Sequence, residues 1–275
     1  MAKKNNMDAT PDMLPDEADV TLTPGGGADD PEVVARYISA EVRELYEVHS
    51  YRHAAAILAT SFPEQLADIE QALLNFRITQ RDIGIPGGNE SDIPKKLSRY
   101  LRPAGWLETK VQGDLLLKLM ASEESFDADG KQSKQIDAGT TEIVIEKFID
   151  GHKIDYVKGR VAFDLEWNSK DQTFDRDLYA MRAFHEYGVI SVGVMVTRSA
   201  TLNPVFEVVT KLDKDGNPEL DKRSGKPMNV RAKYGASTTW MGKLLYRLNT
   251  GRHGGCPILV FGITPKLISD WTAES

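Results

Sequence analysis

The sequence predicts an α/β protein in which helices flank a mixed central sheet. The continuous apolar run Val189–Val196 predicts a strand buried on both faces, as found in sheets that contain parallel pairing and carry helices on both sides. Apolar residues recur at helical spacing early in the chain, and alternating segments with turn signals follow from residue 141 to 168. We therefore expect a single domain over residues 31–272, with an N-terminal helical part at 31–105 and a mixed-sheet core at 106–272.

Length and composition favour a globular protein with one large core. The chain has 275 residues, of which 41% are hydrophobic and 27% charged. No run approaches the roughly 18 consecutive apolar residues of a membrane span, and the first residues lack the apolar segment of a secretory signal. Cys256 is the single cysteine, so an internal disulfide or a cysteine-rich zinc site is excluded. We expect a cytoplasmic protein without a membrane partner.

The first 30 residues are polar, acidic and rich in Pro and Gly, which predicts a disordered tail. Eight acids against two lysines in residues 1–32 contribute −6 of the formal net charge of −7. The rest of the chain is therefore close to neutral, and the overall charge does not argue against a nucleic-acid partner.

Helices are expected next. The spacing of Val34, Ile38, Val42 and Leu45 predicts a helix that begins near Pro31. A second helix is expected over residues 51–60. Ser61 and Glu64 form the pattern of a capping box for a third helix. A Gly/Pro loop at 85–91 and a basic helix at 94–102 follow; the loop either approaches a phosphate or base edge or only connects two elements.

Strands dominate the middle of the sequence. We expect a strand-like segment at 106–119, a polar loop at 122–138 and a β-meander of strands at 141–149, 152–157 and 160–168. Asp150–Gly151 and Lys158–Gly159 are the expected turns of that meander. A helix at 175–187 that ends at Gly188, a surface loop at 211–229, a helix at 237–249 and a buried strand at 257–263 complete the chain.

Two carboxylates share one face of the strand expected at 160–168. Side chains alternate along a strand, so Asp164 and Glu166 lie opposite the apolar Phe163 and Leu165 and stand about 7 Å apart at the backbone. Asp155 precedes the turn on the neighbouring strand and can supply a third oxygen ligand. Two like charges this close require a cation or a raised pKa, and Mg²⁺ suits such oxygen ligands. Alternatively, the acids lie on a solvated strand face and pair with nearby Lys and Arg.

Near the C-terminus, residues 222–269 contain no Asp or Glu. Their basic residues are Lys222, Arg223, Lys226, Arg231, Lys233, Lys243, Arg247, Arg252 and Lys266. A polyanion can dock on such a region because neutralising its phosphates releases counterions. Alternatively, the region is a solvated basic face. Similarly, Ser237, Thr238 and Thr239 either direct donors toward a phosphate or a base edge or merely cap the helix expected at 237–249.

The order of these elements, with Asp155, Asp164 and Glu166 in place, resembles the core of PD-(D/E)xK nucleases. The stretch AFDLEWNSKDQTFDRDLYAMRAFHEYGVISVGVMVTR, together with YRHAAAIL upstream and YGASTTWMGKLL downstream, resembles restriction endonucleases of the BglII/BstYI type. The resemblance covers roughly residues 45–265. The core motif alone is degenerate, and the flanking segments make the resemblance more specific.

The resemblance implies a Mg²⁺-dependent type II restriction endonuclease that acts as a homodimer on a short palindromic site in double-stranded DNA. By position, Asp155, Asp164 and Glu166 would bind metal and act in catalysis. Glu166 replaces the usual Lys of the motif, which leaves open whether Glu166, Lys170 or a phosphate handles the proton. A GATC-containing site, a prokaryotic host and a companion DNA methyltransferase are also implied. The residues expected to contact DNA are Asn89, Asn168, Arg198, Lys233, Ser237, Thr238, Thr239 and Lys243.

Two other functions fit the same residues. A structure-selective or repair nuclease could use this core on branched or damaged DNA without a palindrome. A non-catalytic DNA-binding protein could retain the fold alone.

Overall fold

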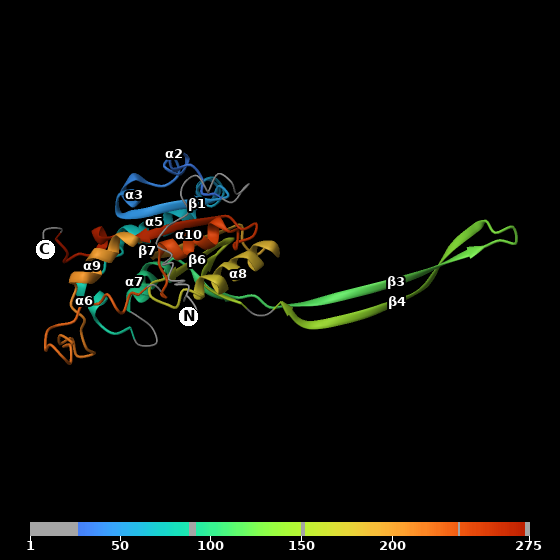
Figure 1. Ribbon diagram of the computed structural model, residues 1–275. Helices are drawn as coiled ribbons and strands as arrows, with labels where there is room; N and C mark the ends of the chain where they lie inside the picture. The colour runs from blue at the N-terminus through green and yellow to red at the C-terminus, as the bar shows by residue number, and fades with distance from the viewer. Residues whose placement is uncertain (1–26, 88–91, 150–151, 236, 273–275) are drawn as a thin grey trace, which may run out of the picture. The chain divides into compact units, whose positions relative to one another are not determined.

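The computed structural model describes residues 27–87, 92–149, 152–235 and 237–272 (Figure 1). Two compact units emerge from the contacts within the chain. One comprises the chain up to Glu108 together with Ile154 onward, and the other is Thr109–Lys153. The larger unit contains the central sheet. No helix in the described ranges is both long and apolar enough to cross a membrane.

A six-stranded mixed sheet organises the larger unit. Its strands are β1 (Tyr46–Tyr51), β2 (Leu107–Lys110), β5 (Lys153–Lys158), β6 (Val161–Glu166), β7 (Val192–Arg198) and β8 (Ile258–Ile263), in the order β1-β8-β7-β6-β5-β2. Strands β6, β7 and β8 run parallel, whereas β1 and β5 pair antiparallel with β8 and β6. Every residue of β6, β7 and β8 is buried. The predicted α/β class with a mixed sheet is confirmed.

Short helices precede the sheet, and β1 lies among them. They are α2 (Pro31–Val34), α3 (Ala40–Leu45), α4 (Ala54–Ser61), α5 (Pro63–Asn75), α6 (Gln80–Gly84) and α7 (Asp92–Leu101). Strand β1 was not predicted, because its apolar residues continue the helical spacing while its backbone pairs with β8. The capping box predicted at Ser61 is wrong: Ser61 ends α4, and Phe62 precedes α5 without a side-chain cap. A capping box exists instead at Thr79 and Asp82.

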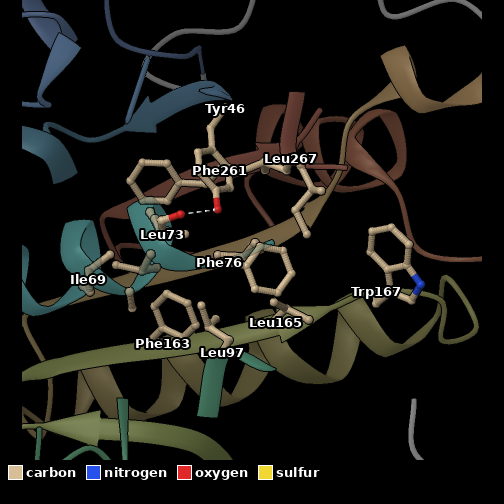
Figure 2. Close-up of a cluster of buried hydrophobic side chains, with 14 of the residues drawn as sticks. Tyr46, Ile69, Leu73, Phe76, Leu97, Phe163, Leu165, Trp167, Phe261 and Leu267 are labelled. Carbon is tan, nitrogen blue, oxygen red and sulfur yellow. Dashed lines mark hydrogen bonds between the residues drawn. The ribbon is translucent and has the colours of Figure 1, made fainter. Parts of the chain in front are cut away.

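One face of the sheet packs on these helices. Phe163 and Leu165 project from β6 toward the side chains of Leu73 and Phe76, and Trp167, just after β6, belongs to the same cluster (Figure 2). The Tyr46 hydroxyl donates a hydrogen bond of 2.8 Å to the Leu73 carbonyl inside this cluster. The alternating strand predicted from the sequence is therefore confirmed, and its apolar side chains form the core.

Two longer helices belong to the region after β6. Helix α8 (Thr173–Glu186) contacts β6, and α10 (Met241–Asn249) contacts α8. A Cβ atom at Gly193 of β7 would lie 2.6 Å from the Met181 sulfur, so glycine allows α8 to approach the sheet closely. Gly188 has φ +72 after α8, as the predicted helix end requires. The segment between β7 and α10 contains a 3-10 turn (Ala200–Leu202) and α9 (Asn203–Val208), and another 3-10 turn (Pro265–Leu267) follows β8.

The smaller unit is a long antiparallel hairpin of β3 (Gly113–Phe126) and β4 (Gln132–Ile149) (Figure 1). The prediction of a polar loop at 122–138 is wrong, because most of that segment is strand. The prediction that 141–149 pairs with 152–157 is also wrong, because β4 pairs with β3 while β5 pairs with β6. Polar residues on both sides of the turn, at 122–125 and 132–135, hid these strands from pattern analysis. The turn expected at Asp150–Gly151 lies outside the described residues.

Candidate active site

The two carboxylates of β6 are buried on the face opposite the apolar cluster. Asp164 is 5% exposed and Glu166 is 8% exposed, so the alternative of a solvated strand face is wrong. Burial raises the pKa of Asp164 well above its ordinary value, and the negative charges of Asp177 and Asp155 raise it further. Burial, followed by the charge of Asp177, raises the pKa of Glu166 to about 7.

Asp155 lies on β5, the neighbouring strand. The antiparallel pairing of Tyr156 with Phe163 places Asp155 beside Asp164 across the two strands. The side chain of Asp155 is exposed, in contrast to Asp164 and Glu166. In the residues that the structure describes, no three His, Cys, Asp or Glu side chains are grouped closely enough to form a ready metal site. In this structure, Asp155 therefore affects Asp164 and Glu166 through its negative charge, which raises their pKa values.

A third buried carboxylate, Asp177, comes from α8 and was missed by the sequence analysis. It is 3% exposed, and its Oδ1 accepts a hydrogen bond of 2.9 Å from Arg176 Nε. Burial raises the pKa of Asp177 to about 6, although Arg176 counteracts this rise. The sequence does contain a signal: Asp177 occupies the helical stripe formed by Phe174, Leu178 and other buried residues, where a charged side chain is unusual.

Several buried oxygen atoms around these carboxylates have unmet hydrogen-bonding capacity. Among the described residues, Asp164 Oδ1, Asp177 Oδ2 and Asn168 Oδ1 are buried and accept no hydrogen bond. Unpartnered buried oxygens are costly and occur where a proton or a cation binds. The donor set, carboxylate and amide oxygens, is the one that a hard divalent cation prefers. The residues present thus fit Mg²⁺ in their chemistry.

An open cavity of about 790 Å³ adjoins the carboxylates. Asp155, Glu166 and Asn168 line it together with Lys233, whereas Asp164 is buried and is not one of its lining residues. The rest of the lining includes Asp82 of α6 and Ile85, Pro86 and Gly87 of the loop that follows it. Four of the predicted site residues, Asp155, Glu166, Asn168 and Lys233, therefore line one concave surface that is large enough for a substrate group.

The segment Ser237–Thr239 is hydrogen-bonded to the chain just after β6. The Thr239 amide donates to the Ser169 carbonyl at 2.8 Å, and the Asp171 amide donates to the Ser237 carbonyl at 3.0 Å. Thr238 pairs with Lys170, whose side chain is exposed. The segment does not begin a helix as predicted, because α10 begins at Met241 after Trp240. These bonds hold the segment beside the carboxylate strand.

Arg198 and Lys233 make internal contacts. Arg198 is 1% exposed; its Nε donates to the Thr239 carbonyl at 2.8 Å, and its guanidinium lies over the rings of Phe206 and Tyr234. Burial lowers the pKa of Arg198 to about 10. Lys233 Nζ donates to the Ile83 carbonyl at 2.9 Å, and burial lowers its pKa to about 8. Both cations hold backbone segments next to the cavity.

The acid-free region at 222–269 is partly neutralised by acids from before and within α8. Lys243 Nζ lies 3.7 Å from Asp171 Oδ2, and Arg247 Nη2 lies 2.9 Å from Asp175 Oδ2. Arg252 also pairs with Asp175. In the folded protein, these acids therefore offset part of the positive charge of residues 222–269. Asn89, the remaining residue predicted to contact DNA, lies outside the described residues.

Comparison with known proteins places the chain in a family. The sequence profile of the family described as "Restriction endonuclease BglII/BglIII" matches residues 46–263, which extend from the first residue of β1 to the last residue of β8. A search of curated proteins found no match. The matched range contains all six strands of the central sheet, the three buried carboxylates and the cavity. The chain therefore belongs to the BglII/BglIII restriction endonuclease family.

Proposed function

We propose that the protein is a Mg²⁺-dependent type II restriction endonuclease that hydrolyses both strands of double-stranded DNA at a short palindromic site. The observation that carries the proposal is a set of buried carboxylates with unpartnered oxygens beside an open cavity. The chain belongs to a restriction endonuclease family, which supports a DNA phosphodiester as the group that is hydrolysed. We also propose that the recognition site contains GATC, as the resemblance to BglII/BstYI-type enzymes implies.

Asp155, Asp164 and Glu166 would hold the metal ion, and Asp177 supports them. When bound, Mg²⁺ polarises the scissile phosphate and lowers the pKa of a coordinated water. Asp155 must turn inward to join the buried pair, because its side chain is exposed. Asp177 adds negative charge next to Asp164 and Glu166, so a cation bound there is stabilised further.

Proton transfer can involve Glu166 or Lys170. A pKa of about 7 lets Glu166 take up a proton near neutral pH, which suits a general base. Lys170 follows β6 and has an exposed side chain, so it can face a phosphate. We propose Glu166, which lines the cavity, as the proton acceptor, with Lys170 as a cationic contact to the substrate.

We propose that DNA contacts are made around Ser237–Thr239. Ser237 is exposed, and Asn168 lines the cavity beside the carboxylates, so both can reach a base edge or a phosphate. Thr238, Thr239 and Lys243 belong to the same part of the chain. Arg198 and Lys233 contribute by holding this surface in place, and Asn89 completes the proposed set of contacts.

A palindromic site has two-fold symmetry, and a protein with the same symmetry can bind both halves of it. We therefore propose a homodimer that places one active site at each strand. The proposed setting is a prokaryotic cytoplasm in which a separate DNA methyltransferase protects the host sites. That enzyme would modify the same sequence without forming a complex with this chain.

Plasmid digestion tests the proposal. With Mg²⁺, the wild-type protein is expected to give discrete fragments with uniform ends, which sequencing of the ends would identify. Asp164→Asn and Asp177→Asn should each lower the cleavage rate, by about 100-fold or more for Asp164. Glu186→Gln, an exposed acid at the end of α8, is the matched control and should cut normally.

The alternatives give different outcomes in the same assay. Smears or cuts only at branched or damaged DNA indicate a structure-selective or repair nuclease. Intact DNA with a mobility shift indicates a DNA-binding protein without catalysis. Normal cleavage by Asp164→Asn would show that the carboxylates of β6 are not the catalytic site.

A further inference from the structure

Arg176 is a cation at the edge of the buried carboxylates. It lies in the first turn of α8, next to Asp177 in the sequence. Its Nε donates a hydrogen bond of 2.9 Å to Asp177 Oδ1, and its Nη2 lies 2.8 Å from the same oxygen. Nη2 also lies 3.8 Å from Glu166 Oε1. Of the cations in the described residues, Arg176 is the only one within ion-pair distance of either carboxylate.

A single arginine leaves the buried carboxylates only partly neutralised. Asp164, Glu166 and Asp177 are each more than nine-tenths buried, and Asp164 Oδ1 and Asp177 Oδ2 accept no hydrogen bond. Burial raises the pKa of Asp177 and of Glu166, and the positive charge of Arg176 counteracts part of each rise. Arg176 is therefore a counter-cation, and the unpartnered oxygens can still accept a further positive charge.

The side chain of Arg176 can leave this position without disturbing the core. It is 66% exposed, whereas the side chain of Asp177 is 3% exposed, so the acid is fixed in the fold and the base lies at the surface. Arg198 and Arg247 differ in this respect, because they are only 1% and 6% exposed. An exposed guanidinium beside a buried acid is suited to exchange one anionic partner for another.

A divalent cation would compete with Arg176 for the same carboxylates. Under the proposed function, Glu166 holds the metal ion and Asp177 adds negative charge beside it. The negative charge that attracts the guanidinium would then be shared with a second cation, and the two positive charges would repel each other. The attachment of Arg176 to Asp177 and Glu166 is therefore weaker when a divalent cation is bound.

A DNA phosphate is the anion that the released guanidinium would meet. The planar donors of arginine match the oxygens of a carboxylate and of a phosphate alike. Glu166 lines the open cavity, where the phosphate to be hydrolysed would lie, and Arg176 Nη2 is 3.8 Å from Glu166 Oε1. A change of side-chain rotamer can thus carry Arg176 from the carboxylates to the phosphate.

We propose that Arg176 exchanges partners: it neutralises Asp177 and Glu166 in the metal-free protein and contacts a DNA phosphate once a divalent cation has bound. The inference rests on the proposed function, because it takes Glu166 as a metal ligand and DNA as the substrate. It adds a residue that contacts the substrate and a coupling between the binding of the cation and the binding of DNA. Such a coupling is reciprocal.

Three substitutions in the full-length protein test this exchange. Arg176→Met removes the charge and keeps most of the side-chain stem, whereas Arg176→Lys keeps the charge without the planar donors. Arg182→Met is the matched control, because Arg182 lies on the same helix, is 48% exposed and pairs with Glu186 at the surface. Thermal unfolding of each variant establishes that it is folded before binding is measured.

Calorimetry with Ca²⁺ in the absence of DNA measures the competition. Arg176→Met should bind Ca²⁺ about fivefold more tightly than the wild type, because the competing cation is gone. Arg182→Met should differ from the wild type by less than about twofold. Unchanged or weaker Ca²⁺ binding by Arg176→Met would overturn the proposal, since Arg176 would then be independent of the metal or hold Asp177 in place for it.

Asp164→Asn separates this failure from a failure of the proposed function. If Asp164→Asn binds Ca²⁺ as tightly as the wild type, the proposed metal site itself is wrong. If it binds Ca²⁺ more weakly while Arg176→Met binds no more tightly, the metal site stands and only the exchange of partners is wrong.

Mobility shifts with a DNA fragment measure the second partner. In a metal chelator, Arg176→Met and Arg182→Met should bind DNA equally well, because the carboxylates engage Arg176. In Ca²⁺, Arg176→Met should bind about fivefold more weakly than Arg182→Met, and Arg176→Lys should lie between them. Equal affinities of the two methionine variants in Ca²⁺ would show that Arg176 does not reach a phosphate. An equal loss in chelator and in Ca²⁺ would show a permanent DNA contact, and either result overturns the exchange.

Discussion

At the scale of single residues, buried carboxylates distinguish the site. Exposed clusters of charged residues do not. Asp164, Glu166 and Asp177 are each more than nine-tenths buried, and all three have a raised pKa. Folding thus forces acids into a position where their charged forms repel each other. Such a cost is typical of functional sites, where stability is lost in exchange for a group that reacts or binds.

This burial makes stability depend on pH in a definite direction. The folded-state pKa values of Glu166 and Asp177, about 7 and about 6, exceed the ordinary values of 4.5 and 3.8. Between its ordinary and its folded-state pKa, each acid binds more protons in the folded protein than in the unfolded chain, so the metal-free protein loses stability as pH rises from about 4 to 7. Asp164→Asn removes one buried acid whose ionisation is disfavoured, and we expect it to raise the free energy of unfolding at pH 8 by about 1 to 2 kcal/mol.

Urea denaturation at pH 6 and pH 8, in a metal chelator, measures this effect. Glu186→Gln removes an exposed charge from the same region and should leave the free energy of unfolding nearly unchanged. If Asp164→Asn is equally stable at the two pH values and no more stable than the wild type, the acids are not under electrostatic strain.

At the scale of elements, the sequence pattern predicted a strand correctly where burial requires a regular arrangement of apolar residues. The alternation of β6 separated Phe163 from Asp164, and the apolar run before Arg198 predicted a buried parallel strand. It failed where long-range pairing decides the structure. Strand β1 exists because β8 offers a partner, and the β3–β4 hairpin runs through residues that are typical of loops. Asp177 was missed because its proximity to Glu166 depends on how α8 packs on the sheet.

Arg198 connects β7 to the segment 234–239, and its removal should loosen that segment. Arg198→Met keeps the side-chain stem but removes the hydrogen bonds to Thr239 and Thr238 and the contact with the ring of Tyr234. We expect a loss of about 2 to 3 kcal/mol in the free energy of unfolding. Hydrogen exchange at residues 237–239 should also become faster.

Arg231→Met is the control for this substitution, because Arg231 is 73% exposed and pairs with Glu207 on the surface. Arg198→Lys should restore part of the stability, since lysine keeps the charge but not the planar donors of the guanidinium. If both arginine variants have the same stability and the same exchange rates, Arg198 does not organise the segment.

At the scale of the whole molecule, a protein of net charge −7 has to bind a polyanion. The acid-free region at 222–269 supplies positive charge, but its Lys243 and Arg247 already pair with Asp171 and Asp175. The buried carboxylates add negative charge beside the cavity. Local electrostatics at the site therefore oppose a phosphate until a cation binds or a carboxylate is neutralised.

This balance predicts that DNA binding depends on a divalent cation. Ca²⁺ prefers the same oxygen ligands as Mg²⁺, so it should increase the DNA affinity of the wild type relative to a metal chelator, by on the order of tenfold. Asp164→Asn should bind DNA more tightly than the wild type in the chelator and gain less from Ca²⁺, because one repulsive charge is already absent. Glu186→Gln makes the same change in net charge at an exposed position and should behave as the wild type. Mobility shifts at constant ionic strength separate this local effect from general screening. Equal gains from Ca²⁺ in all three proteins would place the cation away from the carboxylates of β6.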